Sequence, residues 1–158
     1  MKITVHLNDS EIAICRMLGN LRSMVARGSA VKDRKMGSQS GIDIDEDGVM
    51  GEYAFCKHFN IFFDPSASPR SGSYDCLFKG HRIDIKTTRY KTGKLTSTLK
   101  INPDVDIYVL AIIDEKSVDF VGWLKLKDLC KSENIVNLGH GDGYAVSQEN
   151  LKKWKKTN

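Results

Sequence analysis

The sequence lacks an apolar run of about 20 residues, the length that a membrane-spanning helix needs. Its opening residues, MKITVHLNDSEIA, also lack the apolar stretch of a secretory signal peptide. The four cysteines lie far apart and form no C-x-x-C pair, which argues against a zinc knuckle and against a dense disulfide framework. We therefore expect a cytoplasmic protein whose thiols are reduced and which has no membrane partner.

A large excess of charge of either sign is missing as well. The chain has 24 Lys and Arg residues against 20 Asp and Glu residues, so its net charge is +4. This mild positive charge permits a nucleic-acid partner but does not require one. The 158 residues, of which 41% are hydrophobic, suit one domain with a sizeable core, and we expect a single domain over residues 1–158.

The spacing of apolar residues predicts two helices in the first part of the chain. Asn8 or Asp9 can begin a helix that ends at Gly28, and a second helix should run from about residue 47 to 59. The segment between them, residues 28–42, is polar and contains several basic residues. We interpret it as a surface loop.

The rest of the chain is mainly predicted as strands. Two short strands are predicted at 73–78 and 81–88, followed by a continuous apolar strand at 104–113 and its neighbour at 117–124. One or two helical turns follow at 125–131. The basic tail, 148–156, is a short helix or is frayed. Because the run 104–113 is continuously apolar, we expect a central strand that is buried on both faces. The predicted fold class is α/β, with a mixed β-sheet flanked by helices.

The stretch GIDIDEDGVMGEYA, residues 41–54, resembles the start of a calcium-binding EF-hand loop because three aspartates alternate before a glycine. An EF-hand needs a bidentate glutamate at its twelfth position, and counting from Asp43 that position holds Ala54. We therefore interpret the aspartates as a solvated loop in which Asp45 or Asp47 caps the following helix. A calcium-responsive module is the weakest of the functional hypotheses.

Glu52 occupies an unusual position for a charged residue. In the predicted helix it lies three residues after Val49 and four before Cys56, so it points in the same direction as these apolar side chains. A carboxylate on an apolar face is costly unless something pairs with it. A lysine or arginine partner, a position at the edge of the face, and a metal ion would each satisfy this requirement.

A β-hairpin is predicted around residues 79–80, because glycine is expected in a two-residue hairpin turn. If these two residues form the loop, Phe78 pairs with His81. The same register then places Asp75 directly opposite Asp84. Like charges in that arrangement destabilise a sheet, so a counter-charge is expected nearby.

Lys86 follows Asp84 on the same face of the second strand, since strand side chains alternate. Two carboxylates about 5 Å apart favour a cation between them or a shared proton. Mg²⁺ is bound through one or two carboxylates plus waters and phosphate oxygens. A neighbouring lysine can orient a water nucleophile or stabilise negative charge on a phosphorane-like transition state. The alternative is a solvent-facing hairpin whose charges are simply hydrated.

These elements resemble those of the PD-(D/E)XK nuclease superfamily, which has the restriction-endonuclease-like fold. Glu52 lies on the predicted helix GEYAFCKHF. Asp75 lies in SGSYDC on the first hairpin strand, and IDIKTT on the second strand contains Asp84 and Lys86. The resemblance covers roughly residues 47–130 and implies a mixed β-sheet core of the αβββαβ type.

The resemblance also implies a role for each of these residues. The catalytic set would be Glu52, Asp75, Asp84 and Lys86. Asp75, Asp84, Glu52 and the backbone carbonyl of Ile85 would bind Mg²⁺ or Mn²⁺, and Lys86 would position or activate the attacking water. The reaction would be endonucleolytic hydrolysis of phosphodiester bonds in DNA, with RNA an open alternative. A chain of this size would suit a structure-selective nuclease of repair or recombination, such as a junction resolvase that works as a homodimer. A stand-alone, phage-encoded nuclease and a restriction-like, sequence-specific enzyme are the alternatives.

The resemblance divides the chain into three parts. These are an N-terminal helix and basic loop (1–42), the catalytic core (47–130) and a C-terminal extension (131–158). One departure from the family pattern is that Tyr74 stands where a proline commonly precedes the first aspartate. The alternative function is a non-catalytic module of the same fold that binds nucleic acid or another protein.

Basic residues just past the predicted catalytic strand have the best position to line a DNA groove, since most protein contacts to DNA reach its phosphates. These residues are Arg89, Lys91, Lys94 and Lys100. A second candidate strip is Lys32, Arg34 and Lys35, and a third surrounds Trp154 with Lys152, Lys153, Lys155 and Lys156. The segment LGHGDGY lacks a P-loop lysine, so we interpret it as a turn in which His140 has no part in the site.

Overall fold

The computed structural model describes residues 1–28, 40–67 and 74–155. The helices are α1 (Asp9–Gly28), α2 (Gly41–Phe59) and α3 (Leu126–Leu129). The strands are β1 (Ile3–His6), β2 (Cys76–Phe78), β3 (His81–Thr88), β4 (Leu95–Thr98), β5 (Ile107–Asp114), β6 (Ser117–Lys125), β7 (Ile135–Asn137) and β8 (Asp142–Val146). Short 3₁₀ turns cover Ser132–Asn134 and Gln148–Asn150.

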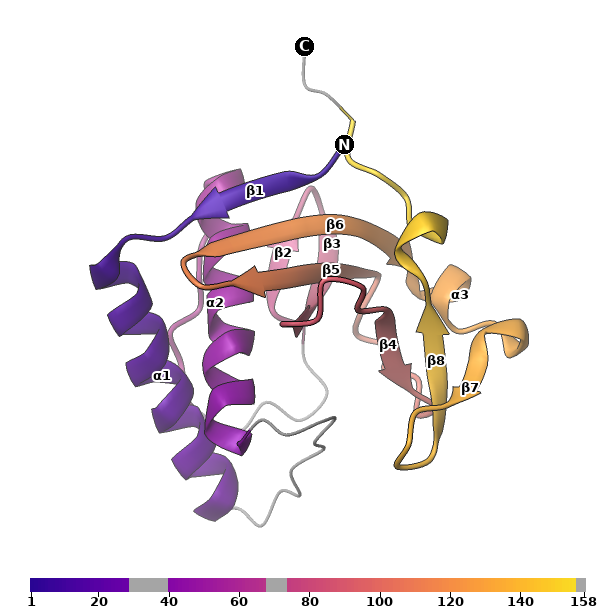
Figure 1. The fold of residues 1–158 in the computed structure, drawn as a ribbon, viewed down its shortest axis with the longest axis horizontal. Coiled ribbons are helices and arrows are strands. Elements are labelled where there is room, and N and C mark those ends of the chain that lie inside the picture. The colour runs from indigo at the N-terminus through magenta and orange to yellow at the C-terminus, as the bar shows by residue number, and fades with distance from the viewer. Residues whose placement is uncertain (29–39, 68–73, 156–158) are drawn as a thin grey trace.

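Five strands form one mixed sheet in the order β1-β6-β5-β3-β2. β3 and β5 run parallel, whereas the other neighbours in this sheet are antiparallel. Helices α1 and α2 lie side by side at one end of the molecule, and a smaller antiparallel sheet, β4-β8-β7, lies at the other end (Figure 1). The predicted α/β class, a mixed sheet flanked by helices, is confirmed.

The order of elements around the last strand of the main sheet differs from the predicted αβββαβ pattern. That pattern places a helix before the last strand, but β5 turns directly into its antiparallel neighbour β6, where Asp114 pairs with Ser117. The two-residue turn contains Glu115, whose φ is +51°, and it leaves no room for a helix. The helical turns of α3 follow β6 instead, within the segment where the sequence predicts them.

Strand β5 lies in the middle of the five-stranded sheet and is buried on both faces, as its apolar run predicts. Val109 and Ala111 belong to the core that β5 forms with α1 and α2. Leu110 and Ile112 belong to a second core, which β5 forms with the small sheet. β5 therefore holds together two cores on opposite faces of the sheet and fixes the position of its parallel neighbour β3.

Helix α2 begins earlier than predicted, at Gly41 rather than near residue 47. Ser40 is its N-cap: the hydroxyl of Ser40 accepts the N–H of Asp43 at 3.2 Å, and the Asp43 carboxylate accepts the N–H of Ser40 at 3.2 Å. This capping box starts the helix, so the prediction that Asp45 or Asp47 is the cap was wrong. The three aspartates of the calcium-like pattern lie inside a helix, and no EF-hand loop exists at 41–54.

Asp47 is buried, with only 3% of its surface exposed, although the sequence suggested a solvated position. The guanidinium of Arg89 explains this burial. Its Nε and Nη2 donate to the two carboxylate oxygens of Asp47 at 2.7 and 2.8 Å. This bidentate pair joins the first half of α2 to the end of β3, because charge-assisted bonds offset part of the cost of burying a carboxylate.

Replacing Arg89 with alanine is expected to lower the free energy of unfolding by about 3 kcal/mol, because it removes a bidentate cation from a buried carboxylate. Lys91→Ala is the matched control. Lys91 is 84% exposed and lies 3.7 Å from Asp114, so its loss should change stability by less than about 0.5 kcal/mol. Urea unfolding followed by circular dichroism measures both values. Equal losses for the two variants would contradict the structural role of Arg89.

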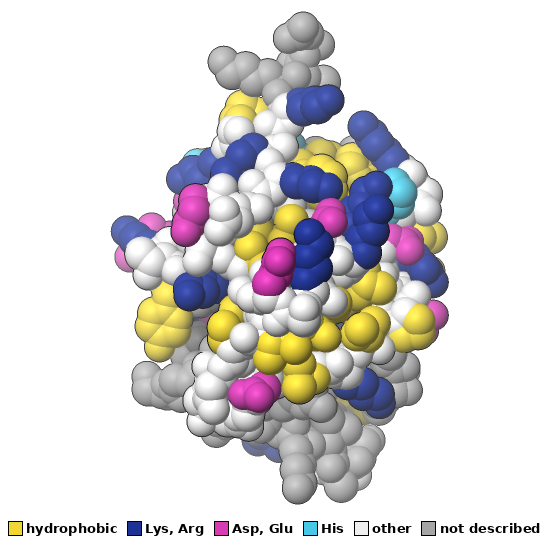
Figure 2. Space-filling view, turned by 90° about the vertical axis from the view of Figure 1, so that its right-hand side faces the viewer, with side chains coloured by type: hydrophobic (Ala, Val, Ile, Leu, Met, Phe, Trp, Pro, Cys, Tyr) yellow, Lys and Arg dark blue, Asp and Glu magenta, His cyan; other side chains and the backbone are white. Residues whose placement is uncertain are grey.

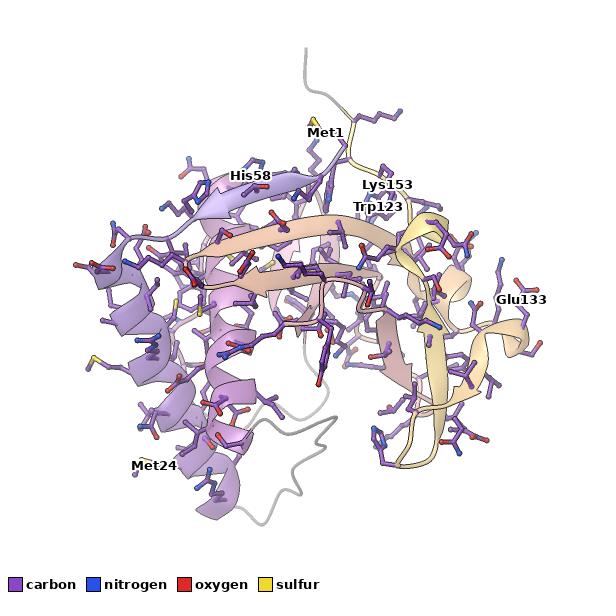
Figure 3. The ribbon with its side chains drawn as sticks, in the orientation of Figure 1. Met1, Met24, His58, Trp123, Glu133 and Lys153 are labelled. Atoms are coloured by element: carbon purple, nitrogen blue, oxygen red, sulfur yellow. The ribbon has the colours of Figure 1, made fainter. Side chains whose placement is uncertain are left out.

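Within the described residues, the basic tail starts with the 3₁₀ turn Gln148–Asn150, contains no α-helix and is not frayed. After the 3₁₀ turn, Lys152 forms a β-bridge with Trp123. Trp154 packs on Phe55, and its indole N–H donates to the carbonyl of Phe120 at 3.1 Å. Lys153 follows Lys152 in the tail, and Figure 3 shows it close to Trp123 near the end of β6. The tail is therefore held by packing of its tryptophan against the main core.

One face of α1 carries an exposed apolar row at intervals of three and four residues. Its members are Ile14, Met17, Leu21 and Met24. Met24 points away from α2 (Figure 3). Despite this row, none of the helices in the described part of the chain has the length and apolar composition needed to cross a membrane.

Candidate active site

The predicted hairpin forms with the predicted register. Strands β2 and β3 pair Phe78 with His81, and the ladder continues in the same register to Cys76. Lys79 and Gly80 form the turn with φ values of +50° and +78°. Positive φ at both positions is what a type I′ turn demands. Because strand side chains alternate, this register decides which face of β3 carries its charged residues.

Asp75 lies just beyond this ladder, which ends at Cys76, so it does not pair with Asp84 as predicted. Its N–H donates to the carbonyl of Ile83 at 2.8 Å, and its carboxylate accepts the N–H of Ile85 at 2.7 Å. The Asp75 side chain therefore caps the edge of β3. The N–H and C=O of a strand residue point to the same side, so the Ile85 carbonyl faces this edge as well.

The carboxylates of Glu52 and Asp84 both lie within electrostatic reach of Asp75. Burial raises the pKa of Asp75 well above its usual value, and the charges of Glu52 and Asp84 raise it further. The Ile85 N–H and the Lys86 ammonium oppose this shift without cancelling it. A divalent cation among these oxygens would relieve the repulsion.

Lys86 forms an ion pair with Asp84, in which Nζ lies 2.8 Å from Oδ1. Burial by itself lowers the pKa of Lys86, but the charge and the hydrogen bond of Asp84 outweigh burial and leave the pKa raised. Nζ also lies 5.7 Å from the centre of the Tyr108 ring, within the range of a cation–π contact. Lys86 is therefore a protonated hydrogen-bond donor at neutral pH.

Glu52 has an arginine partner on the neighbouring helix. Nη1 of Arg22 lies 2.9 and 3.1 Å from the two carboxylate oxygens of Glu52, and both side chains are largely buried. The remaining donors of Arg22 bind the carbonyls of Ser66 and Asp64. The arginine partner, one of the three explanations for Glu52, is thus present, and it fixes the carboxylate between α1 and α2.

Sequence reasoning missed Arg22, although a signal for it was available. Arg22 follows Leu18 by four residues and precedes Val25 by three, so it lies on the inner face of α1. Glu52 shows the same pattern on α2. Two opposite charges on the inner faces of consecutive helices indicate a buried pair when the helices pack together.

A cavity of about 680 Å³ lies where α2 and β3 meet the small sheet. Its titratable lining residues are Arg22, Asp45, Glu52, Asp84, Lys86, Lys100, Tyr108 and His140. Ile85 lines the cavity too, and Asp75 adjoins it through the hydrogen bond to the Ile85 N–H. Three of the four residues of the predicted catalytic set thus share one cavity, and the fourth borders it.

The predicted DNA-contacting residues divide into two groups. Lys100 lines this cavity, and Lys94 lines an adjoining one. Arg89 and Lys91 line neither cavity: Arg89 binds Asp47, and Lys91 lies near the exposed end of β5. The strip of Lys32, Arg34 and Lys35 lies outside the described residues.

The third basic strip, around Trp154, is interrupted by partners. Lys152 pairs with Asp128 at 2.9 Å, and Lys153 donates to the carbonyl of Val121. Figure 2 shows the face of the molecule that carries β7 and β8, where basic side chains are interspersed with acidic and apolar ones. Lys156 lies outside the described residues. Of the basic residues predicted to contact DNA, Lys94 and Lys100 are therefore the two that line cavities at the candidate site.

His140 lines the cavity, although the sequence suggested that it has no part in the site. The segment around it is a turn, as predicted, and Gly139 and Gly141 have φ values of +92° and +129°. This turn joins β7 to β8. The small sheet, which the sequence analysis did not foresee, brings the turn to the cavity.

The donors present suit a hard cation in number and kind. No group of three His, Cys, Asp or Glu side chains within 1–28, 40–67 and 74–155 already has the geometry to hold a metal ion. Mg²⁺ typically takes one or two protein carboxylates and fills its other positions with water and substrate phosphate. Asp84, Asp75 and the carbonyl edge at Ile85 provide such a set, so the residues fit this ion.

No family model matches the chain, and no curated protein or solved structure matches it either. The function therefore has to be inferred from the side chains that meet in the cavity.

Proposed function

We propose that the protein is a metal-dependent nuclease of the PD-(D/E)XK type, which hydrolyses phosphodiester bonds in DNA as an endonuclease. The observation that carries this proposal is the meeting of Glu52, Asp84 and Lys86 in one cavity. Asp75 lies close enough for its pKa to respond to both of these carboxylates. Carboxylates that repel one another beside a protonated lysine suit a divalent cation and an anionic substrate.

The arrangement of elements supports a restriction-endonuclease-like core. Helix α2 with its glutamate precedes the β2–β3 hairpin, and β3 lies parallel to the buried strand β5. The direct turn from β5 into β6 is a departure from that fold family. We therefore rest the functional proposal on the side chains of the site and use the fold as supporting evidence.

Asp75, Asp84 and the Ile85 carbonyl would hold Mg²⁺ or Mn²⁺, with Glu52 completing the site directly or through a water. When bound, the ion would polarise the scissile phosphate and offset the negative charge of the transition state. Arg22 holds Glu52 by its bidentate contact, so the carboxylate keeps one orientation on the cavity wall.

Lys86 acts through its positive charge. The charge and the hydrogen bond of Asp84 raise its pKa, so the ammonium can donate a hydrogen bond. In the proposed reaction it orients the attacking water or stabilises charge on the phosphorane-like transition state. Lys94 and Lys100 bind flanking phosphates, and their loss should flatten the salt dependence of binding.

The second candidate function is a non-catalytic module that binds nucleic acid or protein. The ion pairs of Glu52 with Arg22 and of Asp84 with Lys86 favour it, because they satisfy these carboxylates within the protein.

That the protein forms a homodimer remains a prediction. The apolar row on α1 has the three- and four-residue spacing that suits packing against a second helix.

Metal-dependent cutting is the direct test of the nuclease proposal. Supercoiled plasmid, branched DNA and single-stranded DNA are incubated with the protein in Mg²⁺, in Mn²⁺ and in EDTA. We expect cutting of at least one substrate with either metal and none in EDTA, with internal nicks on any circular substrate that is cut.

Asp84→Asn should abolish this cutting, because it removes a carboxylate charge from the proposed ion site. Asp114→Asn is the matched control, since Asp114 lies exposed at the end of β5 and lines neither cavity. DNA binding with no cutting of any substrate would overturn the nuclease proposal in favour of the non-catalytic module.

A further inference from the structure

A second cavity adjoins the candidate active site. Its volume of about 530 Å³ is in the usual range of small-molecule sites. Ile44, Lys86 and Thr87 line both cavities, so the two are contiguous and reach the same lysine. A group bound in the second cavity would therefore lie next to the phosphodiester that is cut.

The lining of this second cavity suits a flat, uncharged ring with a phosphate beside it. Its aliphatic side chains are Ile44, Leu110, Val136, Leu138 and Ala145. Thr88 and Thr92 contribute hydroxyl groups, and Lys94 contributes a positive charge. No Asp or Glu is among the described residues that line it, whereas Asp45, Glu52 and Asp84 line the candidate active site. This lining could therefore bind a molecule that has flat rings attached to an anionic backbone.

Tyr90 provides an aromatic surface in this cavity, and it is 60% exposed. The turn that carries Tyr90 is held firmly. The N–H of Gly93 donates to the Tyr90 carbonyl at 2.8 Å, and Nε2 of Gln148 donates to the carbonyls of Lys91 and Gly93 at 2.9 and 2.8 Å. A Cβ on Gly93 would clash with the methyl group of Thr88, so the turn packs closely on β3. The backbone that carries the exposed ring is thus held in place beside the cavity.

A duplex keeps its bases stacked between its backbones, so a base reaches a side cavity only when it is unpaired or flipped out. Proteins that hold single strands combine aromatic side chains, on which bases stack, with cations that follow the backbone. Tyr90 and Lys94 provide one of each within a single cavity next to Lys86.

We propose that the second cavity is a subsite for an unpaired nucleobase adjacent to the scissile phosphodiester, so that the substrate is a single-stranded segment rather than an intact duplex. This inference rests on the proposed nuclease function and specifies its substrate class. Tyr90 stacks on the base, and Lys94 pairs with a neighbouring phosphate.

Equilibrium binding tests the subsite without cleavage, using the Asp84→Asn protein in EDTA. The probes are a single-stranded deoxyoligonucleotide that contains one 2-aminopurine, the matching ribo-oligonucleotide, and a DNA hairpin of the same composition. We expect one or both single strands to bind at least about 10-fold more tightly than the hairpin, with the 2-aminopurine fluorescence falling as its ring stacks. Comparison of the two single strands identifies the preferred sugar.

Replacement of Tyr90 separates stacking from general binding. Tyr90→Ala should weaken single-strand binding on the order of 10-fold and remove the fluorescence change, whereas Tyr90→Phe should retain both, because it keeps the ring. Phe62→Ala is the control, since Phe62 is an exposed aromatic residue that lines neither cavity. Two results would overturn the proposed subsite. One is that the protein binds the hairpin as tightly as the single strands. The other is that Tyr90→Ala keeps the full single-strand affinity and the full change in 2-aminopurine fluorescence.

The cleavage assay keeps the two proposals separate. If wild-type protein cuts no DNA with Mg²⁺ or Mn²⁺ but still binds single strands through Tyr90, the nuclease function fails and the base subsite stands. If it cuts duplex DNA while Tyr90→Ala binds as the parent does, the nuclease function stands and the subsite fails.

Discussion

Lys86→Met is expected to lower the rate of metal-dependent DNA cleavage by about 100-fold or more, the usual effect of removing one preorganised donor from a transition state. Methionine keeps most of the length and apolar stem of lysine but lacks the ammonium, so it removes the charge with little change in shape. The ammonium lies 2.8 Å from Asp84 inside the cavity that also contains Glu52, which places it beside the proposed ion.

Two further variants make this prediction specific. Lys86→Arg keeps the charge but replaces a compact ammonium by a planar fork, so it should recover only part of the activity. Lys79→Met makes the same chemical change in the turn of the same hairpin, where Lys79 lines neither cavity, and should leave the rate unchanged. Single-turnover cleavage gives the rates, and thermal unfolding checks the fold. A Lys86→Met protein within about 3-fold of wild type would rule out the proposed charge role.

Gly19→Ala is expected to lower the free energy of unfolding by about 3 kcal/mol, the upper part of the usual range for overpacking. A Cβ at Gly19 would lie 2.5 Å from Cα and 2.7 Å from the backbone nitrogen of Glu46. Both atoms belong to the backbone of α2, so no side-chain rotation can relieve the clash, and α1 has to move away from α2. Arg22, one turn further along α1, would move with it, so DNA cleavage should fall as well.

Gly48→Ala is the matched control, and its effect should have the opposite sign. Gly48 lies within α2, and a Cβ there would meet nothing within 4 Å. Alanine costs less conformational entropy than glycine in a helix, so this variant should be more stable by about 0.5–1 kcal/mol. Urea unfolding of both variants measures the contrast. A neutral or stabilising Gly19→Ala would show that the two helices do not cross this closely.

Features that depend on neighbours in the chain could be predicted from the sequence. The turn at residues 79–80 and the pairing of Phe78 with His81 follow from glycine at a two-residue hairpin, and the structure has both. The burial of β5 on both faces follows from its continuous apolar run. The start of α2 was misplaced even though a local signal existed, because Ser40 and Asp43 form a capping box that aspartate rather than glutamate completes.

Features that depend on distant partners could not be predicted in this way. The local sequence predicts a solvated Asp47, because its partner Arg89 lies 42 residues away. The small sheet could not be predicted because its strands β4 and β8 are distant in the chain. Leu95 lies opposite Val146, about 50 residues away. No periodicity within either segment encodes that pairing, and His140 enters the cavity only through it.

The sequence by itself determined which side chains share a face of a helix or strand, because backbone periodicity places them there whatever the rest of the chain does. It thereby brought together Asp84 and Lys86 on β3 and pointed Glu52 toward the core. Only the tertiary structure decided that Arg22 meets Glu52, that Asp75 caps the edge of β3, and that Tyr90 lines a second cavity beside the candidate site. These contacts join residues far apart in the chain, and the packing of the two cores against β5 selects them.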